Sequence, residues 1–265
     1  MSRDKFKGGK RNDTRRPSRT NQERSGFVTI YGVHPAMAAI LNKNRTIHKV
    51  MCLESMADGV RKARAGFEIE IVTRDDLELL VGKGINHQGI AVHCSKVFNT
   101  NLGNLDLTKE QSILVLLDSV TDVANIGNIV RSSAAFGVDA IIYTKNNVPD
   151  VASNEVIAKT SAGGIDTLDV VEVSNLSQAI KVLQDDGYYV VGLDGNGKFP
   201  LSGFFKKYNL PKVALVLGSE GSGLRELTIK NCDFLVNVPI SERMESLNVA
   251  NACAVALYEY FSTIF

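Results

Sequence analysis

The sequence predicts an α/β protein with a small N-terminal unit and a larger C-terminal unit built on a mostly parallel sheet. Short apolar segments alternate with helix-like segments along most of the chain, a pattern that is typical of βα units. The run at 113–117 is apolar at every position, as expected of a central parallel strand covered on both faces. An asparagine-rich stretch at 97–111 interrupts the alternation and indicates a linker between the two units.

The N-terminal unit, residues 26–96, is expected to be a small α/β sandwich. Pro35 suits the first turn of a helix, because a backbone N–H would have no partner there. The expected elements, in chain order, are strand 28–31, helix 35–42, strand 47–53, helix 58–65, strand 68–72, helix 75–81 and strand 89–94.

The C-terminal unit, residues 112–265, contains longer apolar strands separated by helices. Such a sheet binds its ligands at the carboxyl ends of its strands. The expected elements are strand 113–117, helix 127–136, strands 140–143 and 170–173, helix 176–185, strands 188–193 and 213–217, helix 224–231, strand 234–238 and helix 249–261.

Charge is distributed unevenly along the 265 residues. Residues 1–25 hold nine Lys/Arg against three Asp/Glu, a surplus of six positive charges; because the whole chain carries +1, residues 26–265 carry −5. The first 25 residues also contain almost nothing apolar, so we expect a disordered basic arm. Such an arm suits contact with a polyanion, although a solubilising tail has the same composition.

The four cysteines, Cys52, Cys94, Cys232 and Cys253, are widely spaced within apolar runs, so buried, reduced side chains are expected. Neither they nor the four scattered histidines have a zinc-binding spacing, and no metal is expected. No apolar run approaches the roughly twenty residues that cross a bilayer, and no signal-peptide segment follows the basic start. The cytoplasm is therefore the expected location, with no membrane partner.

Four polar loops follow predicted strands of the C-terminal unit. In the first, at 118–128, Asn125 and Asn128 suit a turn and a helix N-cap. Arg131 is expected about one turn into the next helix, from where its guanidinium can return to the strand ends. The alternative interpretation is an arginine exposed to solvent. A positive charge near the start of a helix is mildly unfavourable, because it opposes the helix dipole.

The other three loops are at 193–198, 218–223 and 245–248. The 218–223 loop is not a Walker loop, because it lacks Gly-Lys-Ser/Thr, and its glycine spacing does not match a Rossmann fingerprint. Glu220 is a poor neighbour for a phosphate and a good one for a hydroxyl, an amine or a cation, so we expect a nucleoside-type cofactor without a pyrophosphate. Ser246 or Asn248 could instead be a plain N-cap of the last helix.

Three segments together resemble the SpoU branch of the SPOUT RNA methyltransferases. The first is Asn125-x-Gly127-x-x-x-Arg131 with Ala134, Ala135 and Gly137. The second is Leu217-Gly218-Ser219-Glu220-Gly221-x-Gly223-Leu224. The third is Val238-Pro239-Ile240 with Ser246-Leu247-Asn248-Val249. The N-terminal unit also resembles this family's substrate-binding domain, which is similar to small RNA-binding ribosomal proteins. The resemblance covers about residues 27–265, and its layout is similar to that of the large-subunit ribosomal RNA guanosine methyltransferases.

This resemblance implies a C-terminal domain with a deep trefoil knot, a homodimer, and methyl transfer from S-adenosylmethionine to a ribose 2′-hydroxyl. The implied catalytic residues are Arg131, Asn125, Glu220, Ser246 and Asn248. The implied cofactor-binding residues are Leu193, Asp194, Gly195, Leu217, Gly218, Glu220, Gly221, Val238, Pro239, Ile240, Leu247 and Asn248.

RNA is expected to reach the site along the basic arm and the N-terminal unit. The candidate contacts there are His34, Arg61, Arg64, His87 and Gln88. For each arginine the alternative is a solvated helix face, and for His87 a structural hydrogen bond within its turn. The favoured substrate is a guanosine of large-subunit ribosomal RNA. A transfer RNA substrate or a non-catalytic RNA-binding or ribosome-assembly factor are the alternatives, and an oxidoreductase ranks below them because no phosphate cradle is present.

Overall fold

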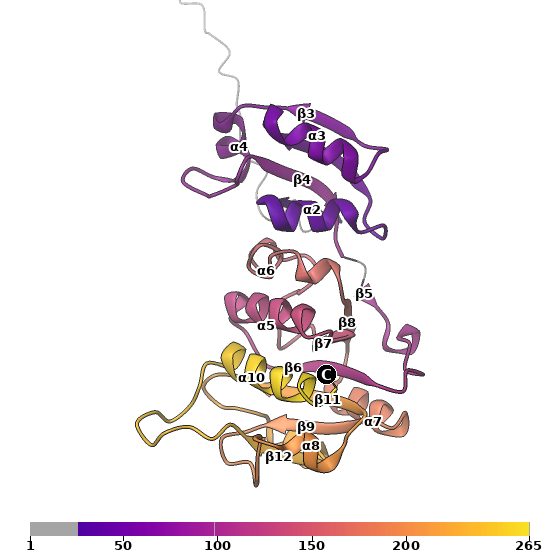
Figure 1. Cartoon of the computed structure of the whole chain (residues 1–265), viewed down its shortest axis with the longest axis vertical. Coiled ribbons are helices and arrows are strands. Elements are labelled where there is room, and N and C mark those ends of the chain that lie inside the picture. The colour runs from indigo at the N-terminus through magenta and orange to yellow at the C-terminus, as the bar shows by residue number, and fades with distance from the viewer. Residues whose placement is uncertain (1–25, 98, 265) are drawn as a thin grey trace, which may run out of the picture.

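The structure, a computed structural model, describes residues 26–97 and 99–264 and contains two sheets in succession along its long axis (Figure 1). The first sheet has the order β1-β4-β2-β3 and is mixed: β4 is antiparallel to β1 and β2, and β2 is parallel to β3. Its strands are β1 (Phe27–Tyr31), β2 (Ile47–Cys52), β3 (Glu68–Ile71) and β4 (Ile90–Ser95), and its helices are α2 (Val33–Leu41), α3 (Glu54–Ala63) and α4 (Arg74–Val81).

The second sheet has eight strands in the order β10-β12-β9-β11-β6-β7-β8-β5, and every neighbouring pair is parallel. The strands are β5 (Asn99–Thr100), β6 (Ser112–Asp118), β7 (Ala140–Thr144), β8 (Asp169–Val173), β9 (Tyr189–Leu193), β10 (Phe199–Pro200), β11 (Lys212–Gly218) and β12 (Phe234–Asn237). In a parallel sheet all the carboxyl ends lie at one edge, so the loops after β12, β9, β11 and β6 are neighbours.

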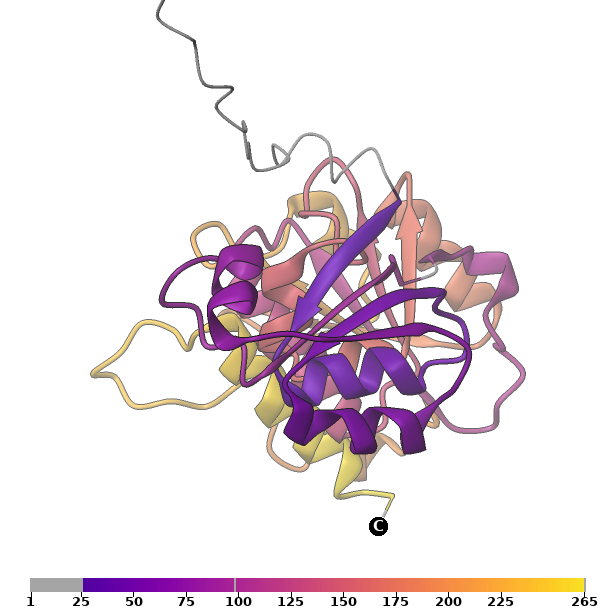
Figure 2. The same cartoon turned by 90° about the horizontal axis from the view of Figure 1, so that it is seen from above.

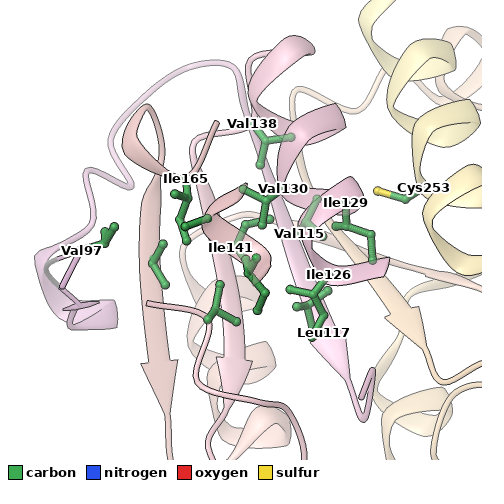
Figure 3. Packing of buried hydrophobic residues seen from close by; sticks show 14 of the residues in the cluster. Val97, Val115, Leu117, Ile126, Ile129, Val130, Val138, Ile141, Ile165 and Cys253 are labelled. Atoms are coloured by element: carbon green, nitrogen blue, oxygen red, sulfur yellow. The ribbon is translucent and has the colours of Figure 1, made fainter. Parts of the chain in front are cut away.

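Helices cover both faces of this sheet. Along β6 the side chains alternate, so that Val115 and Leu117 enter one core and Leu114 and Leu116 enter the other. Helices α5 (Val123–Ala135), α8 (Phe204–Tyr208) and α10 (Val249–Phe261) contribute to the first core, and α7 (Leu176–Asp185) and α9 (Glu226–Asn231) to the second. Figure 3 shows the first core, with side chains of α5 lying between β6 and Cys253 of α10.

The structure corrects several expected elements. The segment expected to be only a linker holds β5, which pairs with β8, and the 3-10 turn η1 (Leu102–Asn104). The helix α6 (Glu155–Thr160), the 3-10 turn η2 (Gly164–Asp166), the helix α8 and the strand β10 were not predicted. Each has six residues or fewer, which is too short for a hydrophobic period to show.

Two helix starts also differ from expectation, because their capping residues were not identified. Helix α5 begins at Val123 instead of 127, since Asp122 is the N-cap and accepts a hydrogen bond from the Asn125 backbone N–H at 2.8 Å. Helix α4 begins at Arg74 behind a reciprocal Thr73–Asp76 capping box.

The two domains share one apolar core. Buried residues of α2 and β4 belong to the same cluster as those of α5, β6 and α10. Helix α6 contacts β1, and α2 contacts η2. Figures 1 and 2 show the N-terminal domain seated over α6 at one end of the larger sheet.

Three of the cysteines, Cys52, Cys94 and Cys253, are buried as expected, whereas Cys232 is half-buried because it lies at the end of α9. Burial raises the pKa of the Cys94 thiol to about 11 and that of Cys232 to about 12, so both stay protonated near neutral pH. Within the described part of the chain, no helix combines the length and apolarity that a membrane span requires, and no three His, Cys, Asp or Glu side chains gather as a metal site would need.

Candidate functional site

A cavity of about 470 Å³ lies where the loops after β9, β11 and β12 meet the start of α10. It is lined by Leu193, Asp194, Gly195, Asn196, Leu217, Gly218, Ser219, Glu220, Gly221, Ser222, Gly223, Val236, Val238, Ile240, Glu245, Ser246, Leu247, Val249 and Ala252. The topology explains this meeting, because β12, β9 and β11 are adjacent in the sheet. All the predicted cofactor-binding residues except Pro239 and Asn248 line the cavity.

The chemistry of the lining selects the kind of ligand. The walls combine apolar side chains such as Leu217 and Val238 with the carboxylates of Asp194, Glu220 and Glu245. The described residues of the lining include no lysine or arginine. Such a cavity suits a flat apolar ring joined to hydroxyl and cationic groups, and it repels phosphate.

Three predicted polar residues meet beside this cavity. The Glu220 Oε1 atom accepts hydrogen bonds from the side-chain amides of Asn125 and Asn248, the latter at 3.0 Å. The Asn248 amide also donates to Asn125 Oδ1 at 3.0 Å. One carboxylate and two amides therefore link α5, the loop after β11 and α10.

Asn248 has a second role. Its Oδ1 atom accepts from the backbone N–H groups of Ala250 and Asn251, so Asn248 is the N-cap of α10. The sequence left Ser246 and Asn248 as alternatives for this cap, and the structure selects Asn248. Ser246 lines the cavity, and its side chain has no hydrogen-bond partner among the described residues.

Arg131 lies apart from this polar cluster. Because α5 begins at Val123, Arg131 is its ninth residue and is over two turns from the helix start, not about one turn. Arg131 is six positions beyond Asn125, which is roughly 9 Å along a helix axis. Arg131 is exposed and forms no hydrogen bond or ion pair with the described part of the chain. The expected return of its guanidinium to the strand ends of the same chain is therefore not seen.

An ion pair that sequence reasoning missed supports the loop after β11. Asp118, fully buried at the end of β6, accepts from the Arg225 backbone N–H at 2.9 Å and from its Nε at 2.5 Å. This contact fixes the base of the loop that carries Glu220. An acid that ends an otherwise apolar strand was the available signal, because a buried carboxylate needs a partner.

In the N-terminal domain, the predicted RNA contacts His87 and Gln88 hold a turn. His87 is buried, and its Nδ1 accepts from the Gly89 backbone N–H at 3.1 Å. Gln88 has a positive φ of 54°, and its Oε1 accepts from the Val33 N–H at the start of α2 at 2.9 Å. His87 therefore forms the structural hydrogen bond that was the alternative for it, and Gln88 joins this turn to the 31–34 segment. Contact of either residue with RNA stays a prediction.

The remaining RNA candidates divide into two groups. Arg64 is committed internally, because its Nη1 donates to the backbone carbonyls of Ile40, Asn42 and Arg45 near the end of α2. These contacts give Arg64 a structural role, and its contact with RNA stays a prediction. Arg61 and His34 are exposed, with Arg61 paired to Asp58 at 3.0 Å.

The sequence matches two family models. Residues 112–258 match the SpoU rRNA Methylase family, and residues 29–99 match the RNA 2′-O ribose methyltransferase substrate binding family.

Individual proteins are similar over nearly the whole chain. The 23S rRNA (guanosine-2′-O-)-methyltransferase RlmB of Coxiella burnetii is 34% identical and covers 89% of this chain and 95% of its own length. The protein of the same name in Xylella fastidiosa strain 9a5c is 39% identical over 74% of this chain and 78% of its own. Among solved structures, the SpoU methyltransferase AviRb from Streptomyces viridochromogenes, in complex with the cofactor AdoMet, has a TM-score of 0.78 at 23% identity and covers 94% of both chains. This last likeness concerns the fold.

Proposed function

Because this chain belongs to the SpoU rRNA methylase family and is an RNA 2′-O-ribose methyltransferase, we propose that it methylates a guanosine of 23S ribosomal RNA with S-adenosylmethionine as methyl donor. The names of the relatives in Coxiella and Xylella support this substrate. Within the chain, residues 26–96 would bind the RNA and residues 112–265 would carry the reaction. We place the reaction in the cytoplasm, where bacterial ribosomal RNA is made.

The acidic, lysine- and arginine-free lining of the cavity is the observation that carries this proposal. S-adenosylmethionine fits it, because the molecule has a flat adenine, ribose hydroxyls, an ammonium group and a cationic sulfur, and no phosphate. Leu217, Val238 and Leu247 offer apolar contacts, and Asp194, Glu220 and Glu245 offer carboxylates. When bound, the cofactor supplies a methyl group that its positive sulfur has already made electrophilic.

The protein then has to align the ribose and help remove its proton. Arg131 is poorly suited to be the base, because a guanidinium in a protein stays protonated. We assign it a bidentate contact with the phosphate next to the target ribose and stabilisation of negative charge that develops on the 2′-oxygen. The proton would leave to the phosphate or to water. Asn125, Glu220, Ser246 and Asn248 would hold the ribose.

A homodimer would resolve the separation between Arg131 and the polar cluster, because the arginine of one protomer could serve the other protomer's cavity. Exposed apolar side chains near the cavity support such an assembly. Met244 and Leu247 lie in the loop after β12, which extends away from the body of the domain in both views, and Val255 and Tyr258 lie on α10 (Figures 1 and 2). Large apolar side chains exposed on a helix and on the loop before it favour an interface there.

The basic arm at residues 1–25 lies outside the described residues, so its role in RNA contact stays a prediction. Its six surplus positive charges would add affinity that weakens with salt.

The proposed function is tested by incubating the protein with S-adenosylmethionine and unmodified 23S rRNA and then mapping 2′-O-methyl groups. One new methylated guanosine is expected. Methylation of transfer RNA instead would overturn the substrate assignment. Cofactor binding without methyl transfer to either RNA would favour a non-catalytic factor.

A further inference from the structure

One buried ion pair crosses between the two domains. Arg45 follows α2 in the N-terminal domain, and Asp166 ends η2 in the catalytic domain; their side chains are only 1% and 2% exposed. The contact is bidentate, with Arg45 Nε donating to Asp166 Oδ1 at 2.5 Å and Nη2 donating to Oδ2 at 3.2 Å. A planar guanidinium on a carboxylate fixes orientation as well as distance.

The partners of this pair are themselves anchored. Arg45 Nη1 donates to the Ser95 carbonyl at 2.7 Å, which ties the arginine to the end of β4. Asn42 donates to Asp166 Oδ1 at 2.9 Å and adds a second link across the same boundary. Next to it the backbones approach closely, because a Cβ on Gly163 would lie 2.6 Å from Ala38 Cβ and 3.1 Å from the His34 carbonyl.

On the catalytic side, η2 packs directly on α5. A Cβ on Gly164 would lie 3.4 Å from the Arg131 Cα, 3.3 Å from the Val130 carbonyl and 3.0 Å from Ala134 Cβ. Ile165 is buried in the same core as Val130 (Figure 3). The segment 163–166 therefore contacts the N-terminal domain on one side and the turn of α5 that carries Arg131 on the other.

We propose that Arg45 and Asp166 are positioning residues that fix the RNA-binding domain relative to Arg131 and the cofactor cavity, and so select structured ribosomal RNA over short RNA. The pair touches neither RNA nor cofactor. It makes the distance between RNA bound by the N-terminal domain and the reacting ribose a fixed property of the protein. This inference rests on the proposed function.

A fixed distance matters because methyl transfer needs in-line approach, and a displacement of about 1 Å can cost roughly 100-fold in rate. A large RNA held by both domains gains from a rigid spacing. A short oligonucleotide that reaches only the catalytic domain does not. The pair should therefore affect the two kinds of substrate differently.

Two variants of the full-length chain test this. Asp166→Asn keeps the shape of the side chain and removes the charge that Arg45 requires. Arg45→Met/Asp166→Leu removes both charges and serves as the test if Asp166→Asn does not fold. This double variant should fold, because an apolar pair of similar volume is tolerated where a lone buried charge is not. Lys230→Met is the matched control, because Lys230 pairs with Glu226 on the exposed surface of α9 at 2.7 Å.

Each protein is assayed for S-adenosylmethionine binding by calorimetry and for kcat and KM on a 23S rRNA domain transcript and on a short oligonucleotide around the methylated nucleotide. In a variant that folds, we expect cofactor affinity within about twofold of wild type and unchanged oligonucleotide turnover. We expect kcat/KM on the transcript to fall roughly 10- to 100-fold. Lys230→Met should match wild type throughout. A folded variant that keeps the wild-type preference for the transcript, or loses both activities equally, overturns the proposal.

Small-angle scattering gives a readout that needs no activity. The interdomain distance distribution of the variants should be broader than that of wild type and of Lys230→Met. Unchanged scattering overturns the positioning role. A further outcome is that wild type methylates no 23S rRNA while the variants still have the broader interdomain distance distribution. That result would overturn the substrate assignment and support the role of Arg45 and Asp166 in fixing the two domains.

Discussion

At the scale of single residues, the site depends on amides that serve two purposes. Asn248 caps α10 with its oxygen and joins Glu220 and Asn125 with its nitrogen. The motif indicated that Asn125, Glu220 and Asn248 matter, and the structure shows that they bind one another. Hydrogen bonds to a charged group are stronger than neutral ones, so this cluster should hold the three segments together.

Two substitutions of Asn248 separate its roles. Asn248→Ala removes the cap and should lower the free energy of unfolding by about 1 kcal/mol in urea titrations. Asn248→Asp keeps an oxygen for the cap and places a second carboxylate beside Glu220, so any loss of stability in this variant comes from the lost amide contact and charge repulsion and not from the cap. Both variants should lose roughly tenfold or more in methyl transfer, because the lost contact to Glu220 is a hydrogen bond to a charged group, worth about 1.5–3 kcal/mol. Full activity of Asn248→Asp would show that the amide contact is dispensable.

Arg131 offers the sharpest test of the chemistry. Arg131→Ala should lower kcat by roughly 100- to 1000-fold, the usual effect of removing one group that stabilises an oxyanion. Cofactor binding should remain close to wild type, because Arg131 does not line the cavity. Calorimetry and single-turnover methylation measure the two quantities. Substantial turnover in Arg131→Ala would refute its assigned role.

At the scale of elements, close backbone contacts shape the loops around the cavity. A Cβ on Gly218 would lie 2.3 Å from the Gly223 carbonyl carbon and 2.4 Å from the Leu224 nitrogen. Only glycine therefore permits the loop after β11 to fold back on the end of its own strand, where Ser219 and Gly223 exchange backbone hydrogen bonds.

Gly218→Ala should force this loop open. We expect the free energy of unfolding to fall by about 1–3 kcal/mol, as for other overpacked sites, and cofactor binding to weaken strongly. Gly103→Ala is the control, because a Cβ on Gly103 would meet nothing within 4 Å. Thermal unfolding and calorimetry give the comparison, and wild-type cofactor affinity in Gly218→Ala would contradict this account of the loop.

In the N-terminal sheet, His93 of β4 gives a pH-dependent stability. Partial burial, together with the neighbouring His48, lowers its pKa below the ordinary value of 6.5. Between those two values the unfolded chain binds a proton that the folded chain does not. The free energy of unfolding should therefore fall as the pH drops through 6.5 and level off below the folded pKa. His93→Gln should flatten this dependence in urea titrations, and an unchanged slope would exclude His93 as its source.

At the scale of the whole molecule, two features concern how the domains and the predicted site residues are arranged. The two domains share a core and a buried ion pair, while Arg131 and the Glu220 cluster stay apart within one chain. We propose that a dimer formed through α10 and the loop after β12 brings them together.

Tyr258→Asp tests this assembly. Tyr258 is 61% exposed on α10, and a charge there should disfavour an apolar interface and convert a dimer to a monomer. Light scattering coupled to size exclusion measures the mass, and methyl transfer should fall with the dimer fraction. Leu79→Asp is the control: Leu79 is 78% exposed on α4 of the N-terminal domain. A monomeric wild type with full activity would refute the shared site.

The sequence by itself determined the succession of the main strands along the chain and the ligand edge of the large sheet, and the motifs that resemble the SpoU family gave about half of the residues that line the cavity. It could do so because apolar runs and glycine-rich strand exits are local signals. Only the tertiary structure decided which side chains meet. Asn125 and Asn248 are 123 positions apart, and Arg45 and Asp166 are 121 apart. Those meetings follow from the order of strands and from the docking of one domain on the other, neither of which is written in any local stretch of the chain.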